Sequence, residues 1–246
     1  MIDVFSITLI SVSAALLFVL TLWKRKTPKQ LRSIPAFDRI YRAIGLSVED
    51  GTRLHISLGH GDLITTRGGS ALAGLAMLCH LTERTSVSDR PPITSAGDPA
   101  LGLLTQDTLQ AGYHAAGVEE LYAPTSGRLT GMSPFGFAAG AMPILCDENV
   151  SANVLIGYFG PESALLAESA ERENIVTIGA SDNLAAQSVL FATSQDSLIG
   201  EELFAAGAYL GASASHPASL TVQDILRWLV ILALLGGAAA KFVGVI

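Results

Sequence analysis

Two long apolar runs, one at each end of the chain, constrain its fold more than any other sequence feature. The first, Val4–Trp23, contains no charged residue, and as a helix at about 1.5 Å per residue it would extend roughly 30 Å, the thickness of a bilayer core. The second, Trp228–Ile246, has Lys241 as its only charged residue. Tryptophan prefers the boundary between membrane and water. We therefore expect transmembrane helices in residues 1–23 and 226–246, with a folded domain between them.

The charges beside these runs predict their orientation. Lys24, Arg25 and Lys26 directly follow the first run, and Asp3 is the only charged residue before it. Since positive residues beside a span stay in the cytoplasm, we expect the amino terminus outside and the central domain inside, in a multi-pass protein. Arg227, before the second run, repeats the signal. The residues expected at the membrane surface are Trp23, Lys24, Arg25, Lys26, Arg227 and Trp228.

Each run has an alternative interpretation. A cleaved signal peptide is an alternative for the first, but such a peptide carries its positive charge before the apolar core and not after it. The second run could instead lie flat on the membrane or dock on a neighbouring subunit, because Lys241 interrupts it. Lysine near a helix end can extend its side chain to the headgroups, so a span remains acceptable.

The net charge of −7 conceals a separation along the chain. Residues 24–42 form a basic collar with seven Lys or Arg and one acid, whereas residues 43–226 hold six Arg and 20 acids. A basic segment beside a span can bind anionic headgroups, and an acidic domain is repelled by nucleic-acid phosphates. The sequence therefore predicts membrane lipids and not nucleic acid as partners. The predicted division is a span at 1–23, the collar at 24–42, an α/β domain at 43–225 and a span at 226–246.

Strand-like and helix-like segments alternate in the central domain, after a short amphipathic helix near Pro35–Leu46. The expected strands are Leu54–Leu58, Pro92–Ser95, Glu120–Ala123, Ala152–Tyr158, Ile175–Ile178 and Val189–Ala192. The expected helices are Thr66–Glu83, Pro99–Ala116, Phe135–Leu145, Pro161–Glu173 and Asp196–Leu210. This alternation is typical of a single α/β domain with a largely parallel sheet.

Several of the expected helices lack a charged face. The segments Gly68–Leu81, Pro134–Leu145 and Leu203–Ser215 contain no Asp, Glu, Lys or Arg and are rich in Ala and Gly. Exposed apolar faces mark association sites, so we expect some of these helices to form contacts between subunits of a homo-oligomer. The alternative is that a further helix layer or close packing on the sheet covers them.

The most suggestive polar cluster lies at the carboxyl end of the first expected strand, where open parallel sheets bind ligands. The segment His55-Ile-Ser-Leu-Gly-His60-Gly-Asp62 offers side chains that can ligate metal or share acid–base work. His55 and His60 would point to opposite faces of a regular strand. Arg67, in Thr65–Ser70, could present a guanidinium to an anion. His60, Asp62 and Arg67 are the candidate ligand-binding residues, and a hydrogen-bonded strand corner is the alternative.

The rest of the sequence supplies no complete catalytic or cofactor motif. It contains neither a GxxxxGK loop nor a GxGxxG turn. Gly179–Asn183 departs from a nucleophile elbow because Asn183 replaces the expected glycine, so Ser181 or Asp182 is expected to cap a helix. Cys79 and Cys146 are too few for a zinc site or a disulfide framework, and their apolar contexts predict buried thiols. We assign no catalytic residue, metal or cofactor.

The basic collar at Lys24–Arg32, the segment Ile34-Pro-Ala-Phe37-Asp-Arg-Ile40, the Gly- and Ala-rich domain and the terminal apolar helix together carry a resemblance. In this plan the chain resembles an uncharacterised bacterial membrane-protein family of unknown function. The resemblance implies a bacterial inner-membrane setting. It implies no activity and no residue role.

The expected function is that of a non-enzymatic, membrane-anchored subunit that self-associates through its α/β domain into a ring or cage-like scaffold. Two anchors, uncharged helices and the incomplete motifs favour it. The alternative is a membrane-tethered α/β domain that binds or hydrolyses a small molecule at Gly59–Asp62 and Thr65–Ser70. Convergence of His60, Asp62 and Arg67 in a closed polar pocket would favour this alternative, and their exposure to solvent would favour the scaffold.

Overall fold

The computed structural model describes residues 4–24, 31–65, 68–88, 90–211 and 215–242. The chain forms two compact units, each described by itself. Unit 1 consists of Met1–Leu31 together with Gly211–Ile246, and unit 2 is Arg32–Leu210. The limits of unit 2 differ from the predicted 43–225 because helix α2 (Pro35–Glu49) packs in its core and helix α9 (Ser215–Phe242) lies outside it.

Unit 2 is built around a six-stranded parallel sheet with the order β3-β2-β1-β4-β5-β6. The strands are β1 (Arg53–Gly59), β2 (Ile93–Ala96), β3 (Gly127–Leu129), β4 (Val150–Tyr158), β5 (Val176–Ser181) and β6 (Asp196–Leu198). The predicted α/β class with a parallel sheet is confirmed. This is the strand order of the Rossmann-type doubly wound sheet, in which the winding direction reverses between β1 and β4.

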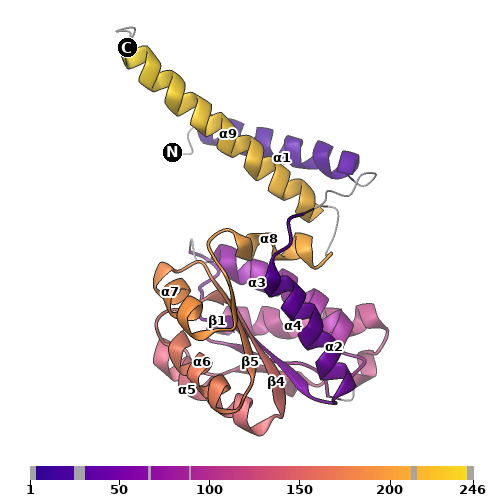
Figure 1. Cartoon of the computed structure of the whole chain (residues 1–246). Helices are drawn as coiled ribbons and strands as arrows, with labels where there is room; N and C mark the ends of the chain where they lie inside the picture. Colours follow the sequence, from indigo (N-terminus) through magenta and orange to yellow (C-terminus); the bar gives the residue numbers. More distant parts are fainter. Residues whose placement is uncertain (1–3, 25–30, 66–67, 89, 212–214, 243–246) are drawn as a thin grey trace. The chain divides into compact units, whose positions relative to one another are not determined.

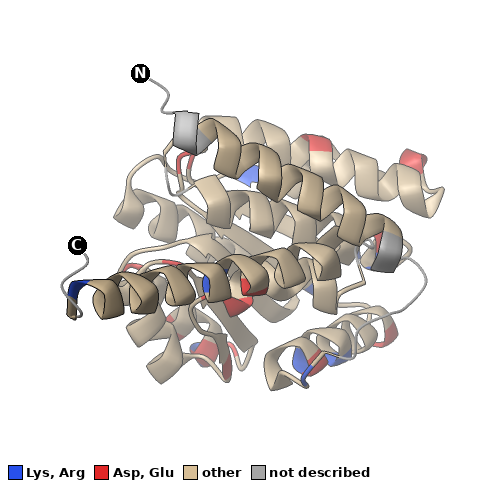
Figure 2. Ribbon diagram, turned by 90° about the horizontal axis from the view of Figure 1, so that it is seen from above, with Lys and Arg blue, Asp and Glu red and all other residues tan. Residues whose placement is uncertain are grey.

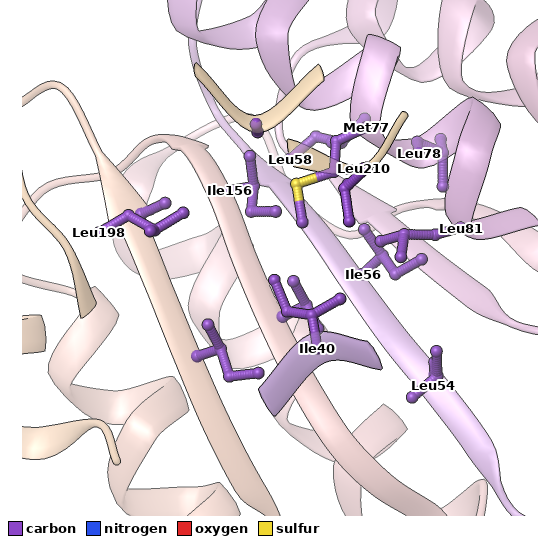
Figure 3. Packing of buried hydrophobic residues seen from close by; sticks show 14 of the residues in the cluster. Ile40, Leu54, Ile56, Leu58, Met77, Leu78, Leu81, Ile156, Leu198 and Leu210 are labelled. Carbon is purple, nitrogen blue, oxygen red and sulfur yellow. The ribbon is translucent and has the colours of Figure 1, made fainter. Parts of the chain in front are cut away.

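Helices cover both faces of the sheet (Figure 1). One face carries α2, α3 (Gly68–Thr85), α4 (Pro99–Ala116) and α8 (Glu202–Tyr209), and the other carries α5 (Pro134–Asp147), α6 (Ser163–Arg172) and α7 (Leu184–Thr193). Figure 3 shows the larger core, where Ile40 of α2 and Met77 of α3 meet the strand residues Ile56 and Ile156. Burial of this apolar surface is the main stabilising term.

Two predicted strands are wrong. Val189–Ala192 lies inside helix α7, because a short apolar run with β-branched residues fits a buried helix as well as a strand. Glu120–Ala123 overlaps the 3₁₀ turn Glu119–Leu121, which another 3₁₀ turn, Pro124–Ser126, follows before β3 begins at Gly127. The predicted helix Asp196–Leu210 is divided into strand β6 and helix α8.

The chain enters and leaves unit 2 side by side. The ring of Phe37 in the first turn of α2 stacks on that of Tyr209 at the end of α8, with centroids 4.6 Å apart. Tyr41 Oη donates a hydrogen bond to the Tyr209 carbonyl at 3.1 Å. Helix α2 leads into the amino end of β1, and α8 follows the carboxyl end of β6. Because α2 runs toward the amino end of β1, the start of α2, where the chain enters unit 2, lies toward the carboxyl edge of the sheet. The place where the chain leaves unit 2, after α8, lies toward the same edge.

Unit 1 is a pair of packed helices, α1 (Val4–Lys24) and α9. Leu20 of α1 packs with Ala218 and Val222 of α9. Among the described helices, only α9 is long and apolar enough to cross a membrane, while the described apolar stretch of α1, Ile7–Leu22, is shorter. Helix α9 begins 11 residues before the predicted span at 226, and Figure 2 shows few charged positions along its path to the C label.

Candidate functional site

His55 lies in the middle of β1 and is fully buried. Its Nδ1 is 2.8 Å from Asn153 Oδ1 on β4, and its Nε2 is 2.9 Å from Ser95 Oγ on β2, which in turn lies 3.0 Å from Ser57 Oγ on β1. Burial lowers the pKa of His55 to about 4, although the hydrogen bond to Asn153 opposes this shift. His55 is therefore neutral at pH 7 and joins three neighbouring strands through a buried polar network.

Gly59 ends the regular alternation of β1. Its φ is +70°, and a Cβ there would lie 2.2 Å from the carbonyl oxygen of Tyr158 on β4. The Gly59 carbonyl accepts a hydrogen bond from Gly97 N at 2.8 Å, and His60 N donates to the Tyr158 carbonyl at 3.0 Å. Only glycine fits this close approach with a positive φ. Because of this turn, the side chain of His60 no longer follows the face-to-face alternation of strand β1, which places His55 within the sheet.

His60 pairs with a carboxylate that follows the neighbouring strand. Its Nε2 lies 2.7 Å from Glu162 Oε1, which also accepts a hydrogen bond from Gly160 N at 2.6 Å. The side chain of Glu162 is 1% exposed and that of His60 11%. The rings of Tyr158 and Phe137 flank the imidazole at centroid distances of 5.5 and 6.1 Å. We call this arrangement the His60–Glu162 pair; it lies where the winding of the sheet reverses.

Hydrogen bonding decides the charge of Glu162. Burial by itself raises the pKa of this carboxyl, but the hydrogen bonds from His60 and from the Gly160 amide outweigh burial and hold the pKa below its usual range. An ionised carboxylate only accepts hydrogen bonds, so it selects the imidazole form with hydrogen on Nε2. In the tautomer with hydrogen on Nε2 alone, Nδ1 of His60 can accept a hydrogen bond from a ligand or a proton, and the carboxylate fixes the ring orientation.

The other predicted site residues do not join this pair within the described chain. Asp62 is exposed, and its Oδ1 accepts a hydrogen bond from Ile64 N at 2.9 Å in the loop after β1. Arg67 lies outside the described residues. The ligand-binding role of His60, Asp62 and Arg67 stays a prediction.

Sequence reasoning missed Glu162. Glu162 falls inside the expected helix Pro161–Glu173, whereas α6 begins at Ser163. The Gly160-Pro161-Glu162 segment begins two residues after β4 ends at Tyr158. Its position at the carboxyl end of a strand was the sequence signal that could have identified Glu162 as a site residue.

Acidic residues recur along the carboxyl edge of the sheet. One follows each of β1, β2, β4 and β5, namely Asp62, Asp98, Glu162 and Asp182. Asp98 caps α4 by accepting a hydrogen bond from Leu101 N at 2.9 Å, as its position before Pro99 predicts. The described residues that lie between β1, β2, β4 or β5 and the helix that follows each of them include no Lys or Arg. Acids therefore outnumber cations among these described residues.

The remaining sequence candidates have structural positions. Ser181 Oγ is buried and accepts hydrogen bonds from Phe159 N and Asn183 N, and α7 is capped by Asn183 and not by the predicted Ser181 or Asp182. Cys146 is exposed, which corrects the expected burial, because it lies on the outer face of α5. Cys79 is half-buried, and burial raises its thiol pKa.

The predicted membrane-surface residues are only partly described. Arg227 and Trp228 are exposed on α9. Arg25 and Lys26 lie outside the described residues, as do the side chains of Trp23 and Lys24. Across the described parts of the chain, no group of three His, Cys, Asp or Glu residues is placed to hold a metal ion.

The comparisons with known proteins assign a family without an activity. The model of a domain of unknown function, DUF6754, matches residues 2–246. The chain belongs to the DUF6754 family. Membership agrees with the resemblance to an uncharacterised family. Neither the curated proteins nor the solved structures include a significant match.

Proposed function

We propose that unit 2 binds a small molecule at the carboxyl ends of β1 and β4, where His60 is the polar contact and Glu162 orients it. The observation that carries the proposal is the His60–Glu162 pair at the winding reversal of a doubly wound sheet. Ligands of such sheets bind outside the carboxyl ends of the strands at this point. A buried carboxylate that fixes one imidazole nitrogen and leaves the other as an acceptor is suited to recognition or proton transfer.

The charge of this edge limits the ligand class. Asp62, Asp98 and Asp182 follow β1, β2 and β5 at the edge that carries the pair, and the described residues between these strands and the next helices include no Lys or Arg. A phosphate-bearing ligand would meet repulsion, whereas hydroxyl or amine donors can bond to an imidazole acceptor and to carboxylates. The proposed ligand is therefore a neutral or cationic molecule with hydrogen-bond donors, such as a polyol or an amine.

A thermal-shift screen of the full chain in uncharged detergent tests this proposal. Polyols and amines should raise the melting temperature of the wild type, and nucleotides at equal concentration should not. His60→Ala should remove the shift, while Arg172→Gln, which changes an exposed ion pair with Glu168 on α6, should keep it. A ligand that stabilises His60→Ala as strongly as the wild type would contradict the proposed site, whereas a panel that stabilises neither would favour the scaffold.

The scaffold function remains a second proposal, favoured by the outer face of α7. Leu184 and Phe191 are 77% and 69% exposed, and the helix has no charged residue. Two of the uncharged segments expected at subunit contacts are less favourable, because α3 is covered by α4 and α8, and Leu203 and Ala206 of α8 are buried within the chain. We infer a homo-oligomer, in a ring or cage-like assembly, that contacts a neighbour through α7.

Mass photometry of the detergent-solubilised chain tests self-association. The wild type should form particles of several chains, and the double variant Leu184→Glu with Phe191→Glu should dissociate them, because two charges would be buried in an apolar contact. Gln110→Glu, at an exposed position of α4, is the matched control and should assemble normally. A wild type that consists of single chains at micromolar concentration would exclude the scaffold.

The membrane setting is also proposed in its finer form. We infer a multi-pass protein of the bacterial inner membrane, with α1 as the second span, lipid contacts at the basic collar and unit 2 in the cytoplasm. The apolar side chains of α1 and the basic segment after it support this orientation. A reporter fused after Ile246 should be active outside, and one inserted at Arg90 inside. The reverse pattern would overturn the orientation.

A further inference from the structure

A cavity of about 620 Å³ lies at the amino edge of the sheet, opposite the edge that carries the His60–Glu162 pair. Its walls come from the starts of β1 and β3, the segment before β2, the 3₁₀ turns after α4 and the end of α5. We call it the amino-edge pocket. Its volume is within the range of small-molecule sites.

Two guanidinium groups share one carboxylate in this pocket. Arg53 on β1 lies 3.6 Å from Glu148 through Nε and Oε2, and Arg128 on β3 forms an ion pair with Glu148 through Nη2 and Oε1. Arg128 Nε also donates to the Thr125 carbonyl at 3.3 Å. No other Lys, Arg, Asp or Glu lines the pocket among the described residues. The described lining residues therefore carry one net positive charge, although residues 43–226 as a whole are strongly acidic.

Hydrogen-bond donors of the pocket are incompletely used. Arg53 Nε is buried and has no hydrogen-bond partner in the described chain. Buried polar groups are normally paired, and a guanidinium has five N–H donors that one shared carboxylate cannot satisfy for two arginines. The Ser88 and Ser126 side chains, both largely buried, also line the pocket. This donor surplus fits an acceptor-rich anion.

The rim of the pocket is apolar. Val87 and Leu121 are 63% and 48% exposed, and Pro91 and Ala123 complete this part of the lining. Exposed apolar side chains beside an arginine pair suit a ligand whose anionic end reaches Arg53 and Arg128 while an apolar part covers the rim. We propose that the amino-edge pocket binds a small organic anion, a phosphate monoester or carboxylate with an apolar substituent, through Arg53 and Arg128.

This site is independent of the proposed function, because it consists of other residues and is proposed to bind an anion, whereas the His60–Glu162 pair is proposed to bind a neutral or cationic molecule. Two sources could supply the same chemistry, a free metabolite or the phosphate of a lipid headgroup. The places where the chain enters and leaves unit 2 lie toward the carboxyl edge, and the pocket lies at the other edge. We therefore assign the anion to a free small molecule.

Isothermal titration calorimetry of the full chain in uncharged detergent tests the assignment, with phenyl phosphate and inorganic phosphate as probes. Phenyl phosphate should bind more tightly than inorganic phosphate, because only it covers Val87 and Leu121. Arg128→Gln should weaken phenyl phosphate about tenfold or more, as expected for the loss of a charge-assisted contact. Glu148→Gln should strengthen binding, since it removes the competing carboxylate.

The control is Arg172→Gln, which removes an equal charge from an exposed ion pair on α6 and should leave binding unchanged. Circular dichroism of each variant checks that it is folded. The absence of phenyl phosphate binding at millimolar concentration, or equal binding by the wild type and Arg128→Gln, would overturn the site. Displacement of phenyl phosphate by phosphatidic acid micelles, but not by phosphatidylcholine micelles, would overturn the assignment to a free molecule.

Discussion

His55 and His60 belong to the same short sequence segment but have different environments in the fold. His55 is fully buried within β1, and both of its ring nitrogens have partners on neighbouring strands. His60 follows the turn at Gly59, retains partial exposure, and is fixed through one nitrogen by Glu162. The difference teaches that the end of a strand separates a histidine that joins the sheet from one that can meet a ligand.

The largest expected effect is that of His55→Leu. The substitution leaves Asn153 and Ser95 without their buried partner, so the free energy of unfolding should fall by about 4 kcal/mol. Urea denaturation followed by circular dichroism measures this loss. A cost below about 1 kcal/mol would show that the network contributes little, and the contrast between the two histidines would then fail.

Acid should destabilise unit 2 through His55. Its pKa is about 4 in the folded protein, below the ordinary histidine value of 6.5, so the unfolded chain binds more protons between these pH values. Stability therefore decreases as the pH falls from 6.5 toward 4, by about 3 kcal/mol for a shift of this size. Denaturation midpoints measured from pH 7 to pH 5 should fall in the wild type and change less in His55→Leu. Equal slopes would contradict the neutral, buried state of His55.

Glu162→Gln should have a smaller effect on stability. The amide keeps the shape of the side chain but loses the charge that strengthens its hydrogen bonds with His60 and Gly160, at a cost of about 1–2 kcal/mol at pH 7. Because the pKa of Glu162 is lowered in the fold, its contribution is present at neutral pH and is lost in acid as the carboxyl is protonated. The difference between wild type and variant should therefore shrink below pH 4.5. A difference that grows in acid would exclude an ionised Glu162.

The smallest effect is expected for Asp62→Ala. Asp62 is exposed, and its side chain accepts one local hydrogen bond from Ile64 N. Removing this turn contact should change the unfolding free energy by about 0.5 kcal/mol. Thermal unfolding of Asp62→Ala beside Asp62→Asn, which keeps an acceptor, measures it. A loss as large as that of His55→Leu would mean that Asp62 has a buried partner in the assembled protein.

The fold could be predicted where periodicity and length agree. The Asp98-Pro99 start and the left-handed Gly117 end identify α4 from local chemistry. β3 was missed because its three residues, Gly127–Leu129, are too few for a pattern and gain their strand conformation from pairing with β2. Val189 was assigned to a strand because branched side chains favour strands, but contacts of α7 with α6 and the sheet override that preference.

Half of the candidate site could be predicted. His60 was found because Gly59 and Gly61 mark a turn after an apolar strand. Its partner Glu162 is 102 residues away, and a carboxylate at a helix start has a simpler local explanation. The pairing depends on β1 and β4 being neighbours, which is a property of the strand order and not of either segment. The amino-edge pocket was missed for the same reason, since Arg53 and Arg128 meet only after the strands assemble.

The stack of Phe37 on Tyr209 has a mechanical consequence. The two ends of unit 2 lie next to each other, so tension on the flanking segments would first separate Phe37 from Tyr209. This contact would open before force reaches the sheet. Contacts that are broken one after another yield at a lower force than strands that are sheared all at once. Because its two ends are close together, unit 2 could be removed and the flanking segments joined by a short linker, as for a domain inserted into another protein.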